Sequence, residues 1–373
     1  MTPATAIAPT ARTVLLTGAT GMVGAEVLAR LLERDDVSVV TVLRAADDER
    51  ARRRLDGLLL DVLGLDPAVR GRTVALAGDV ACPGLGLSAP ARDRVLATVD
   101  GVIHSAASVA FDMPLPEARA INVGGTHAVL SLARELAWRG RLRRLVHVST
   151  AYVAGDHAGR FREDQAWAGQ SFRNTYEQSK LEAELLLASA GADLPLVVAR
   201  PSIVVGDARS GWTAAFHGLY GPLRAFARGL IRRIPAAPEG LVDTVPLDYV
   251  GAGIVHLLDA EDVGGVVALA AGDGAVTVRD LVALASRTLG DREPPVLDPA
   301  ARDESGSPVL LPYFDVRTRF DTRRAAAVLG RAGLRPVPLA GRIDALLRYA
   351  SAAAWGRRPV DRRSARAGTL AAA

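Results

Sequence analysis

The feature that most constrains this 373-residue chain is a set of three glycines between an apolar segment and an amphipathic one. Thr13–Thr17 is typical of a buried strand, Ala25–Leu32 has the periodicity of a helix, and Gly18, Gly21 and Gly24 lie between them. Glycines at this spacing allow a tight turn and let a pyrophosphate touch the backbone, where helix N-terminal amides meet its charge. The pattern predicts a dinucleotide site, with a simple tight turn as the alternative.

The same alternation of apolar runs and helical segments continues through the first 200 residues. Near-continuous apolar strands of this kind belong to a parallel sheet covered on both faces. We therefore expect an α/β fold, a doubly wound parallel Rossmann sheet with a smaller, interleaved C-terminal substrate lobe. The expected strands are Thr13–Thr17, Val37–Leu43, Thr73–Ala77, Gly101–Ser105, Leu145–Ser149 and Leu196–Ala199, and the longest expected helices are Glu117–Trp138 and Thr175–Ala190.

After Arg200 the alternation loosens into a region rich in Gly, Pro and aromatic residues, which indicates a second lobe. The expected divisions are a flexible leader (1–12), a nucleotide-binding domain (13–206 with about 241–272), a substrate lobe (about 207–240 and 273–350) and a disordered tail (351–373). In the lobe we expect a helix at Val278–Leu289, a loop-rich connection at 294–312 and helical structure over Arg323–Tyr349.

Composition excludes several classes of protein. The single cysteine, Cys82, rules out an intramolecular disulfide and a cysteine-based metal cluster. No apolar stretch reaches the roughly 18 to 20 residues of a membrane span. A net charge of +4 does not argue for nucleic acid. We expect a cytoplasmic protein with no metal site, no membrane span and no nucleic-acid partner.

The end of the second strand bears on the form of the cofactor. An NAD enzyme usually places a carboxylate there for the ribose 2′-hydroxyl, whereas this chain has Arg44, with Arg54 one helix later. A guanidinium suits a 2′-phosphate, which favours NADPH. Because Asp47 and Asp48 follow closely, NAD remains the alternative. The expected cofactor contacts of the glycine turn are Gly18, Thr20, Gly21, Met22, Val23 and Gly24.

A second cofactor contact is expected after the third strand, at Gly78-Asp79-Val80. The Asp79 side chain and the Val80 amide are placed to read the adenine amino group and ring nitrogen. By itself the Gly-Asp pair is equally typical of a turn.

One lysine stands out in a chain that uses arginine for every other long basic side chain. Lys180 is the only lysine, and it lies four residues after Tyr176 on an expected helix, so both side chains share one face. A compact ammonium can bond a nicotinamide ribose and lower the pKa of the phenol, which makes Tyr176 a proton donor or acceptor near neutral pH. An exposed helical Tyr and Lys is the alternative.

Hydroxyl and amide side chains near the sheet edge complete the expected reaction centre. Ser149 and Thr150 end the fifth strand, where ligands of open α/β sheets bind, and either can bond a carbonyl oxygen that accepts hydride. We favour Thr150, although strand hydroxyls often satisfy backbone groups. Asn122 is placed to hold a helix bulge and a water near Lys180, or is an ordinary polar helix residue.

These residues resemble the extended short-chain dehydrogenase/reductase superfamily over roughly residues 13–290. The motifs are the glycine triplet, Gly78-Asp79-Val80, His104–Ala107, Asn122, Ser149-Thr150, Tyr176 with Lys180, and Arg200-Pro201-Ser202. Within it the chain is similar to the thioester reductase and fatty acyl-CoA reductase branch, which includes reductase domains of carboxylic acid reductases and peptide synthetases. The segments that carry this likeness are Leu43–Ala45 with Arg54-Leu55, Val148–Val153, Tyr176–Glu184, Arg200–Gly206 before Gly211-Trp212, and Val242–Tyr249.

The resemblance implies reduction of an acyl thioester by NADPH to an aldehyde, with onward reduction to the alcohol left open. It implies that Thr150 and Tyr176 hold the carbonyl oxygen and that Lys180 anchors the ribose. It adds Ser105, Ala106, Ala107, Pro201, Ser202 and Ile203 as cofactor contacts, and Ser108, Tyr152, Trp212, Phe216 and Tyr220 as substrate contacts. Packing of the lobe is an equal explanation for the last three and for Phe226.

The expected partner is an acyl group on coenzyme A or on an acyl or peptidyl carrier protein, supplied in trans because the first strand begins at Thr13. The protein is expected to be a monomer or a homodimer. One rival keeps the fold but makes the chain an epimerase, dehydratase or alcohol dehydrogenase on a nucleotide sugar or steroid. A second rival is a non-catalytic NADP-binding sensor, which the presence of both Tyr176 and Lys180 disfavours.

Overall fold

A computed structural model describes residues 12–301 and 308–368. The described chain divides into two compact units. Unit 1 comprises the described residues up to Val153 together with Asn174–Arg200 and Gly251–Val267. Unit 2 comprises Ala154–Arg173, Pro201–Val250 and the described residues from Ala268 onward. The expected leader lies almost wholly outside the described residues.

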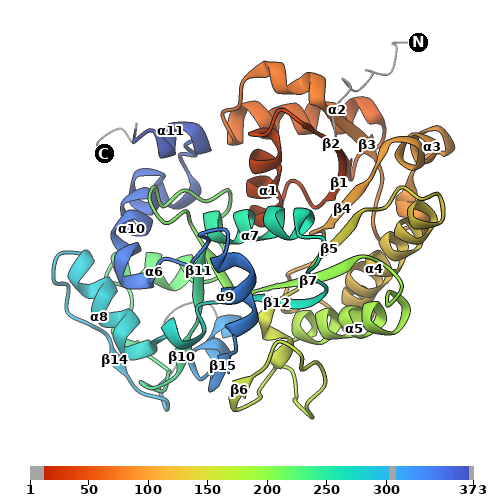
Figure 1. The fold of residues 1–373 in the computed structure, drawn as a ribbon. Helices are drawn as coiled ribbons and strands as arrows, with labels where there is room; N and C mark the ends of the chain where they lie inside the picture. Colours follow the sequence, from red (N-terminus) through yellow and green to blue (C-terminus); the bar gives the residue numbers. More distant parts are fainter. Residues whose placement is uncertain (1–11, 302–307, 369–373) are drawn as a thin grey trace. The chain divides into compact units, whose positions relative to one another are not determined.

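Unit 1 holds most of a seven-stranded sheet, which confirms the predicted doubly wound α/β fold (Figure 1). The strand order is β12-β7-β5-β4-β1-β2-β3, and the strand pairs from β3 to β7 are parallel. The strands are β1 (Arg12–Thr17), β2 (Val37–Leu43), β3 (Thr73–Ala77), β4 (Gly101–His104), β5 (Arg144–Val148), β7 (Leu196–Pro201) and β12 (Gly265–Leu269).

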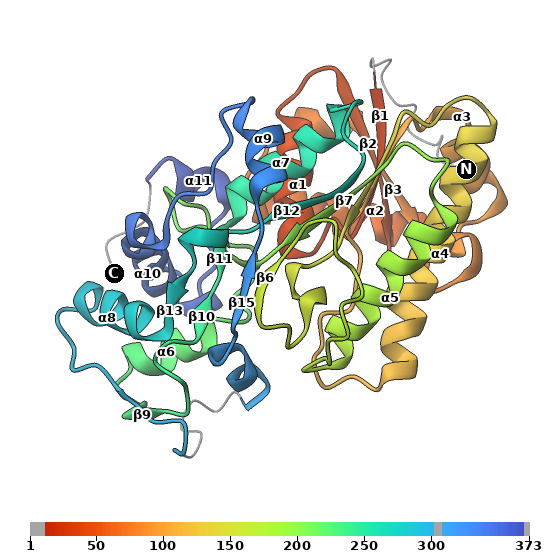
Figure 2. The same ribbon diagram turned by 60° about the horizontal axis from the view of Figure 1, so that its bottom comes forward.

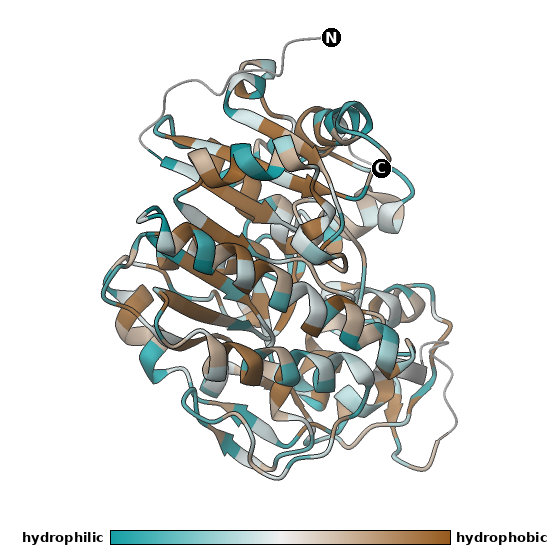
Figure 3. Cartoon of the chain, turned by 90° about the vertical axis from the view of Figure 1, so that its right-hand side faces the viewer, coloured by the Kyte–Doolittle hydropathy of each residue, from teal (hydrophilic) through white to brown (hydrophobic). Residues whose placement is uncertain are grey.

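Helices cover both faces of this sheet (Figure 2). They are α1 (Met22–Leu32), α2 (Asp48–Gly57), α3 (Ala89–Thr98), α4 (Leu115–Trp138), α5 (Thr175–Ala190) and α7 (Leu247–Asp259), and a π-helical turn, Leu58–Val62, follows α2. One apolar cluster joins the sheet to α3 and α4, and a second joins α4 to α5 and β7. Figure 3 shows the apolar strands in brown between helices with mixed faces. These strands are buried on both faces, which explains why they are apolar at nearly every position.

Unit 2 is built from short strands and helices around its own apolar cluster. Its strands pair as β6 (Gly159–Phe161) with β15 (Thr318–Phe320), β8 (Ile203–Val205) with β11 (Thr244–Pro246), β9 (Arg233–Ile234) with β14 (Val296–Leu297), and β10 (Leu241–Val242) with β13 (Val276–Thr277). Its helices are α6 (Tyr220–Ala227), α8 (Val278–Thr288), α9 (Arg323–Gly330), α10 (Ile343–Ala352) and α11 (Arg362–Arg366).

The division differs from the expected domain boundaries at four places within the expected nucleotide-binding domain. Residues 154–173, 201–206, 241–250 and 268–272 belong to unit 2. The reason is strand pairing over long sequence separation: β6 pairs with β15, and β10 and β11 pair with β13 and β8. Such pairings leave no local signal in the sequence.

Two expectations for the C-terminal part are corrected. The helical stretch predicted over Arg323–Tyr349 is two helices, α9 and α10, because Gly333 takes a positive φ of 70° and Pro336 and Pro338 follow it. The tail predicted to be disordered is ordered as far as Gly368. Its Val360 carbonyl accepts hydrogen bonds from Trp212 and Tyr349, each at 3.1 Å. Residues 369–373 lie outside the described part.

Within the described ranges, no helix combines the length and the apolar composition that a membrane crossing requires.

Candidate active site

The sheet order places the site at the carboxyl ends of β1 and β4. These two strands are neighbours, and Thr17 pairs with His104 at their ends. The chain continues from β1 through α1 to β2 on one side and from β4 through α4 to β5 on the other. Ligands of open α/β sheets bind at such a reversal of strand order. We therefore describe the predicted site residues of unit 1 by their position at this edge of the sheet.

The three glycines of the first turn have different local reasons for being glycine. Gly18 has a φ of 75°, and a Cβ there would lie 2.6 Å from the Ala106 amide nitrogen. A Cβ on Gly24 would lie 2.0 Å from the Gly18 oxygen. Gly21 is exposed, and a Cβ there would meet only the Gly18 oxygen at 3.4 Å. Backbone packing thus requires glycine at positions 18 and 24, whereas at Gly21 the space that a side chain would fill is open.

That open space has the properties of an anion site. Gly21 is the N-cap of α1, no side chain caps the helix, and its first turn contains no acidic residue. The N-terminal amides and the helix dipole favour a negative group at this position. The cradle therefore fits the pyrophosphate of a dinucleotide.

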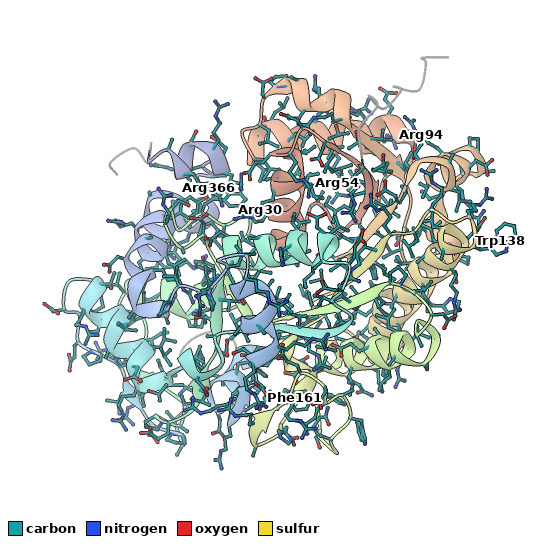
Figure 4. All side chains as sticks on the ribbon, viewed as in Figure 1. Arg30, Arg54, Arg94, Trp138, Phe161 and Arg366 are labelled. Atoms are coloured by element: carbon teal, nitrogen blue, oxygen red, sulfur yellow. The ribbon has the colours of Figure 1, made fainter. Side chains whose placement is uncertain are left out.

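A pocket of about 510 Å³ lies in unit 1 at the carboxyl ends of β2 and β3. Arg44, Gly78 and Asp79 are among its lining residues, as the sequence predicted for an adenosine site. Arg54, labelled in Figure 4, donates from Nη1 to the Arg44 carbonyl at 3.0 Å. Val80 is not part of the lining, and its side chain packs near Gly125 of α4.

Asp47 and Asp48, the two carboxylates that kept NAD as an alternative cofactor, accept hydrogen bonds from backbone amides. Asp47 caps α2 and accepts a hydrogen bond from the Arg50 amide at 2.7 Å. Asp48 accepts one from the Ala77 amide, also at 2.7 Å. Both side chains therefore have structural roles at the rim of the pocket. The Arg44 side chain is exposed there and has no carboxylate partner among residues 12–301 and 308–368.

Thr150 and Tyr176 form a hydroxyl pair at the end of β5. The side chain of Tyr176, on the first turn of α5, is hydrogen-bonded to the Thr150 side chain, and burial raises the pKa of Tyr176 to about 12. Thr150 also accepts from the Tyr152 amide at 3.2 Å. The sequence predicted a pKa of Tyr176 lowered by Lys180. That expectation is corrected, because burial has the larger effect and the Lys180 ammonium is directed elsewhere.

Lys180 is buried, with 2 % of its surface exposed. Its Nζ donates to the Val148 carbonyl at 2.8 Å and lies 3.3 Å from Nε2 of His147. Burial lowers the pKa of Lys180 to about 8, and the Glu184 carboxylate opposes this shift. The ammonium thus lies next to the last residue of β5, and Lys180 is one helical turn from Tyr176.

A buried ion pair connects helix α5 to the sheet. Arg200, on β7, binds Glu184 of α5 through Nε at 3.0 Å and Nη2 at 2.6 Å, and both side chains are almost fully buried. This pair ties the helix that carries Tyr176 and Lys180 to the sheet. Removing one partner of such a pair leaves an uncompensated buried charge, at a cost of about 3–5 kcal/mol.

Asn122 has a different task from the one predicted. Its amide donates to Ser179 Oγ at 2.9 Å and to the Ser108 carbonyl at 3.1 Å, and its Oδ1 accepts from the Ser108 amide at 2.8 Å. Helix α4 is a continuous α-helix through this residue, so the expected bulge is absent. The Asn122 carbonyl is taken by the Thr126 hydroxyl at 2.6 Å. Asn122 therefore fixes the loop after β4 to α5.

That loop carries the predicted contacts Ser105, Ala106, Ala107 and Ser108. The Ser105 amide donates to the Thr17 carbonyl at 3.2 Å, and the Ala106 amide donates to the Thr17 hydroxyl at 3.3 Å. The loop is thus held against the glycine turn at one end and against Asn122 at the other. Tyr152, the remaining predicted substrate residue of unit 1, is buried.

The other predicted contacts belong to unit 2. Pro201 ends β7, Ser202 follows it and Ile203 begins β8, and their roles stay predictions. Trp212 and Tyr220 are buried in that unit, where Trp212 bonds Val360 and the Tyr220 hydroxyl accepts from the Gly206 amide at 2.8 Å. Phe216 stacks on Tyr349 with ring centroids 5.9 Å apart. Packing accounts for all of these contacts, and substrate contact at Trp212, Phe216 and Tyr220 stays a prediction.

Sequence reasoning missed His147 as a neighbour of the reaction centre. It is one of two buried histidines, with His104, that face each other on adjacent strands. A histidine inside an otherwise apolar strand two residues before Ser149 was the available signal.

Comparison with known proteins places the chain in a family. The model of the NAD-binding family described as male sterility protein matches residues 16–254, which is more than half of the chain. The chain belongs to this family. A relative is the fatty acyl-CoA reductase wat of Drosophila melanogaster, 30% identical over 269 residues, which are 63% of this chain and 52% of that protein. A linear gramicidin synthase of Brevibacillus parabrevis is 32% identical over 252 residues, 65% of this chain and 5% of that protein.

Family members that match therefore extend well beyond the shared region, and the chain spans about half the length of the fatty acyl-CoA reductases. Among solved structures, the terminal R domain of the myxalamid PKS-NRPS pathway matches with a TM-score of 0.80 at 27% identity, covering 95% of this chain and 94% of that domain. A UDP-glucuronic acid 4-epimerase from Bacillus cereus matches at 19% identity with a TM-score of 0.67, covering 91% and 97%, which shows the shared fold alone.

Proposed function

We propose that this chain is an NADPH-dependent oxidoreductase that reduces acyl thioesters, carried by coenzyme A or by a carrier protein, to aldehydes. The observation that carries the proposal is the arrangement in unit 1 of the Thr150–Tyr176 hydroxyl pair, with Lys180 one turn along the same helix and the glycine cradle at the same sheet edge. The full-length likeness to an R domain and the likeness to fatty acyl-CoA reductases favour thioesters over the sugar and steroid substrates of the rival proposal.

NADPH fits the described residues better than NADH does. The Gly21 cradle would hold the pyrophosphate, and Asp79 lines the adenosine pocket. Arg44 presents a guanidinium in that pocket, which suits a 2′-phosphate, and both nearby carboxylates already accept backbone hydrogen bonds. Lys180 would hold the nicotinamide ribose. When bound, the reduced nicotinamide supplies the hydride for the thioester carbonyl carbon.

The residues at the end of β5 act on the carbonyl oxygen. With a pKa of about 12, the phenol of Tyr176 is neutral at physiological pH and donates a hydrogen bond. Together with Thr150 it stabilises the negative charge that grows on the oxygen as the carbon is reduced. The Lys180 ammonium adds positive charge close by. Loss of the thiol from the reduced carbon then gives the aldehyde, and the same phenol can protonate the oxygen if the aldehyde is reduced again.

The test is NADPH oxidation by the purified protein with a panel of acyl-CoA, acyl-pantetheine and carrier-bound thioesters, together with the matching aldehydes and detection of free thiol. Thioester-dependent turnover with stoichiometric thiol release is expected. Tyr176→Phe should lower kcat by about 10²–10³-fold with little change in NADPH affinity, because it removes a donor to the developing charge. Tyr313→Phe, a buried tyrosine of unit 2, serves as the matched control.

Turnover of nucleotide sugars or steroids with inert thioesters would overturn the thioester proposal and leave the rival reductase or epimerase function. Aldehyde turnover in addition to thioester turnover would extend the reaction to the alcohol. Unchanged kcat in Tyr176→Phe would remove Tyr176 from the mechanism.

A further inference from the structure

The Lys180 ammonium has an unusual set of partners for a buried cation. Its Nζ is bonded to one carbonyl, that of Val148, and to one side chain, that of His147. Within residues 12–301 and 308–368, no carboxylate is hydrogen-bonded to it. Buried cations are commonly paired with carboxylates because desolvation of an isolated charge is costly. The acceptor set at Lys180 is instead entirely neutral.

His147 is placed to be a neutral acceptor. It is 1 % exposed on β5, and burial together with the nearby Lys180 charge holds the pKa of His147 well below its usual range. A neutral imidazole that accepts through Nε2 carries its proton on Nδ1. Nδ1 of His147 is buried and has no hydrogen-bond partner among the described residues. Of the two ring nitrogens, Nε2 is thus the one with a polar neighbour, and that neighbour is the Lys180 ammonium.

The neighbouring histidine shows the opposite arrangement. Thr126 donates its hydroxyl proton to the Asn122 carbonyl, so toward Nε2 of His104 at 3.4 Å it can only accept. His104 then carries its proton on Nε2 and accepts through Nδ1 from Thr17 at 2.7 Å. The pKa of His104 is lowered to about 3 by burial. The two rings, 5.2 Å apart, are alike in burial but only His147 reaches the lysine.

The other titratable side chains around Lys180 already have hydrogen-bond partners. On α5, the Glu184 carboxylate raises the pKa of Lys180, but both of its oxygens bind Arg200 of β7. Tyr176 is neutral and bonded to Thr150. His104 of β4 is neutral and held by two threonines. His147 is thus the side chain available to hold Nζ directly.

We propose that His147 is a positioning residue of the reaction centre, whose Nε2 accepts a hydrogen bond from the Lys180 ammonium and so keeps that ammonium charged and directed toward the edge of β5. A neutral acceptor suits this task because it stabilises the cation without cancelling its charge. A carboxylate at the same place would neutralise the field that the ribose and the carbonyl oxygen require. The importance of this contact for catalysis rests on the proposed function, whereas the contact itself does not.

Because Lys180 is the only lysine, its protonation can be measured directly. Protein grown with 13C-lysine gives a single Cε signal whose chemical shift reports the state of Nζ. In the unaltered chain this signal should titrate near pH 8. In His147→Leu, which keeps an apolar side chain without an acceptor, the midpoint should fall by about one pH unit or more, as expected for loss of a hydrogen bond to a charged group.

Two further variants separate positioning from packing. His147→Gln places an amide oxygen where it can replace Nε2 and should restore most of the midpoint. His104→Gln alters the matched buried ring without touching Nζ and should leave the midpoint within about 0.3 pH units of the unaltered chain. An unchanged midpoint in His147→Leu, or an equal fall in His147→Gln and His147→Leu, would overturn the proposal.

Two more measurements extend the test. NADPH affinity should weaken roughly fivefold in His147→Leu at pH 8, the change in the charged fraction of Lys180 for a midpoint one unit lower. If His147→Leu does not fold, 15N-histidine spectra of the unaltered chain decide the matter. The His147 ring should show the Nδ1-protonated tautomer below pH 8 and respond at the lysine midpoint. An Nε2-protonated tautomer below pH 8 would overturn the proposal, even if thioester reduction itself is established.

Discussion

Burial moves the pKa values of Tyr176 and Lys180 in opposite directions. Tyr176 rises to about 12 and Lys180 falls to about 8, although the two side chains lie one turn apart on α5. At neutral pH the phenol is therefore protonated and the ammonium is charged. As pH rises, the ammonium is lost first. Because Lys180 is proposed to hold the ribose, we expect the upper pH limit of cofactor binding to follow the pKa of Lys180 and not that of Tyr176.

The same lowered pKa gives a prediction for stability. In the unfolded chain Lys180 titrates near 10.5 and in the folded chain near 8, so the unfolded state binds the extra proton between these values. Below pH 8 the buried charge costs roughly 3 kcal/mol of folding free energy. Lys180→Met should therefore raise the free energy of unfolding at pH 7 by up to about that amount while abolishing turnover.

The stability gain of Lys180→Met should shrink as pH rises from 8 toward 10, because Lys180 of the unaltered chain then loses its buried charge. Urea unfolding of both proteins at several pH values measures this difference. A Lys180→Met variant that is less stable than the unaltered chain at pH 7 would show that the ammonium is satisfied by its partners.

Arg44 gives a second prediction at the scale of one side chain. Its guanidinium is exposed in the pocket at the carboxyl ends of β2 and β3, without a carboxylate partner in the described ranges. Arg44→Ala should raise the KM for NADPH by about 10–100-fold, the worth of a charge-assisted hydrogen bond to phosphate, and leave the KM for NADH nearly unchanged. Arg53→Ala, at an exposed arginine of the following helix α2, is the control. Equal effects on both cofactors would remove the 2′-phosphate assignment.

At the scale of one element, the turn between β1 and α1 separates folding from binding. Gly24→Ala places a Cβ 2.0 Å from the Gly18 oxygen, so the turn must move, and we expect a loss of about 1–3 kcal/mol despite the better helix propensity of alanine. Gly21→Ala meets only the Gly18 oxygen at 3.4 Å and should change stability by less than about 1 kcal/mol.

Gly21→Ala, which should leave stability nearly unchanged, should instead have a large effect on cofactor binding. Gly21→Ala fills the cradle and should weaken NADPH binding at least tenfold in a protein that melts normally. Thermal unfolding and fluorescence titration of both variants check this pair. Equal melting temperatures for the two variants would contradict the division of roles.

The regular elements of unit 1 were predictable because their signals are local. Burial on both faces makes β2 and β3 apolar at most positions, and their predicted bounds, Val37–Leu43 and Thr73–Ala77, are those of the structure. The interaction of Lys180 with His147 was not predictable. It depends on the register of β5 against β4 and on the direction of α5, which tertiary packing decides.

The pKa of Tyr176 is raised where the sequence predicted a lowered value, and the reason is similar. Spacing places an ammonium near a phenol, but spacing carries no information on desolvation, which dominates the pKa of both groups. Asn122 likewise has the expected position on α4 while its hydrogen bonds go to Ser108 and Ser179. Residue types and faces follow from the sequence, whereas pKa values and hydrogen-bond partners follow from the fold.

At the scale of the whole molecule, each compact unit is assembled from segments far apart in the sequence. Unit 2 depends on its C-terminal segment, where Val360 accepts hydrogen bonds from Trp212 and Tyr349 and Arg366 pairs with Asp207 at 2.7 Å. Deleting residues 359–373 leaves two buried donors unsatisfied, at about 1–3 kcal/mol each. We expect a clear fall in the melting temperature, measured by calorimetry.

Deletion of residues 369–373 alone removes none of these contacts and is the matched control. Indistinguishable melting curves for the two truncations would contradict the structural role of the tail. A lower melting transition confined to unit 2 would show in addition that the two units unfold independently.

The buried position of the single lysine bears on the chemistry of the proposed aldehyde product. Aldehydes condense with primary amines to form imines, and most proteins expose many lysine amines to such damage. Here every other long basic side chain is an arginine, and the one lysine amine is 2 % exposed and held by two acceptors. A protein of this composition, releasing aldehydes one after another, would offer its own product almost no side-chain amine to modify.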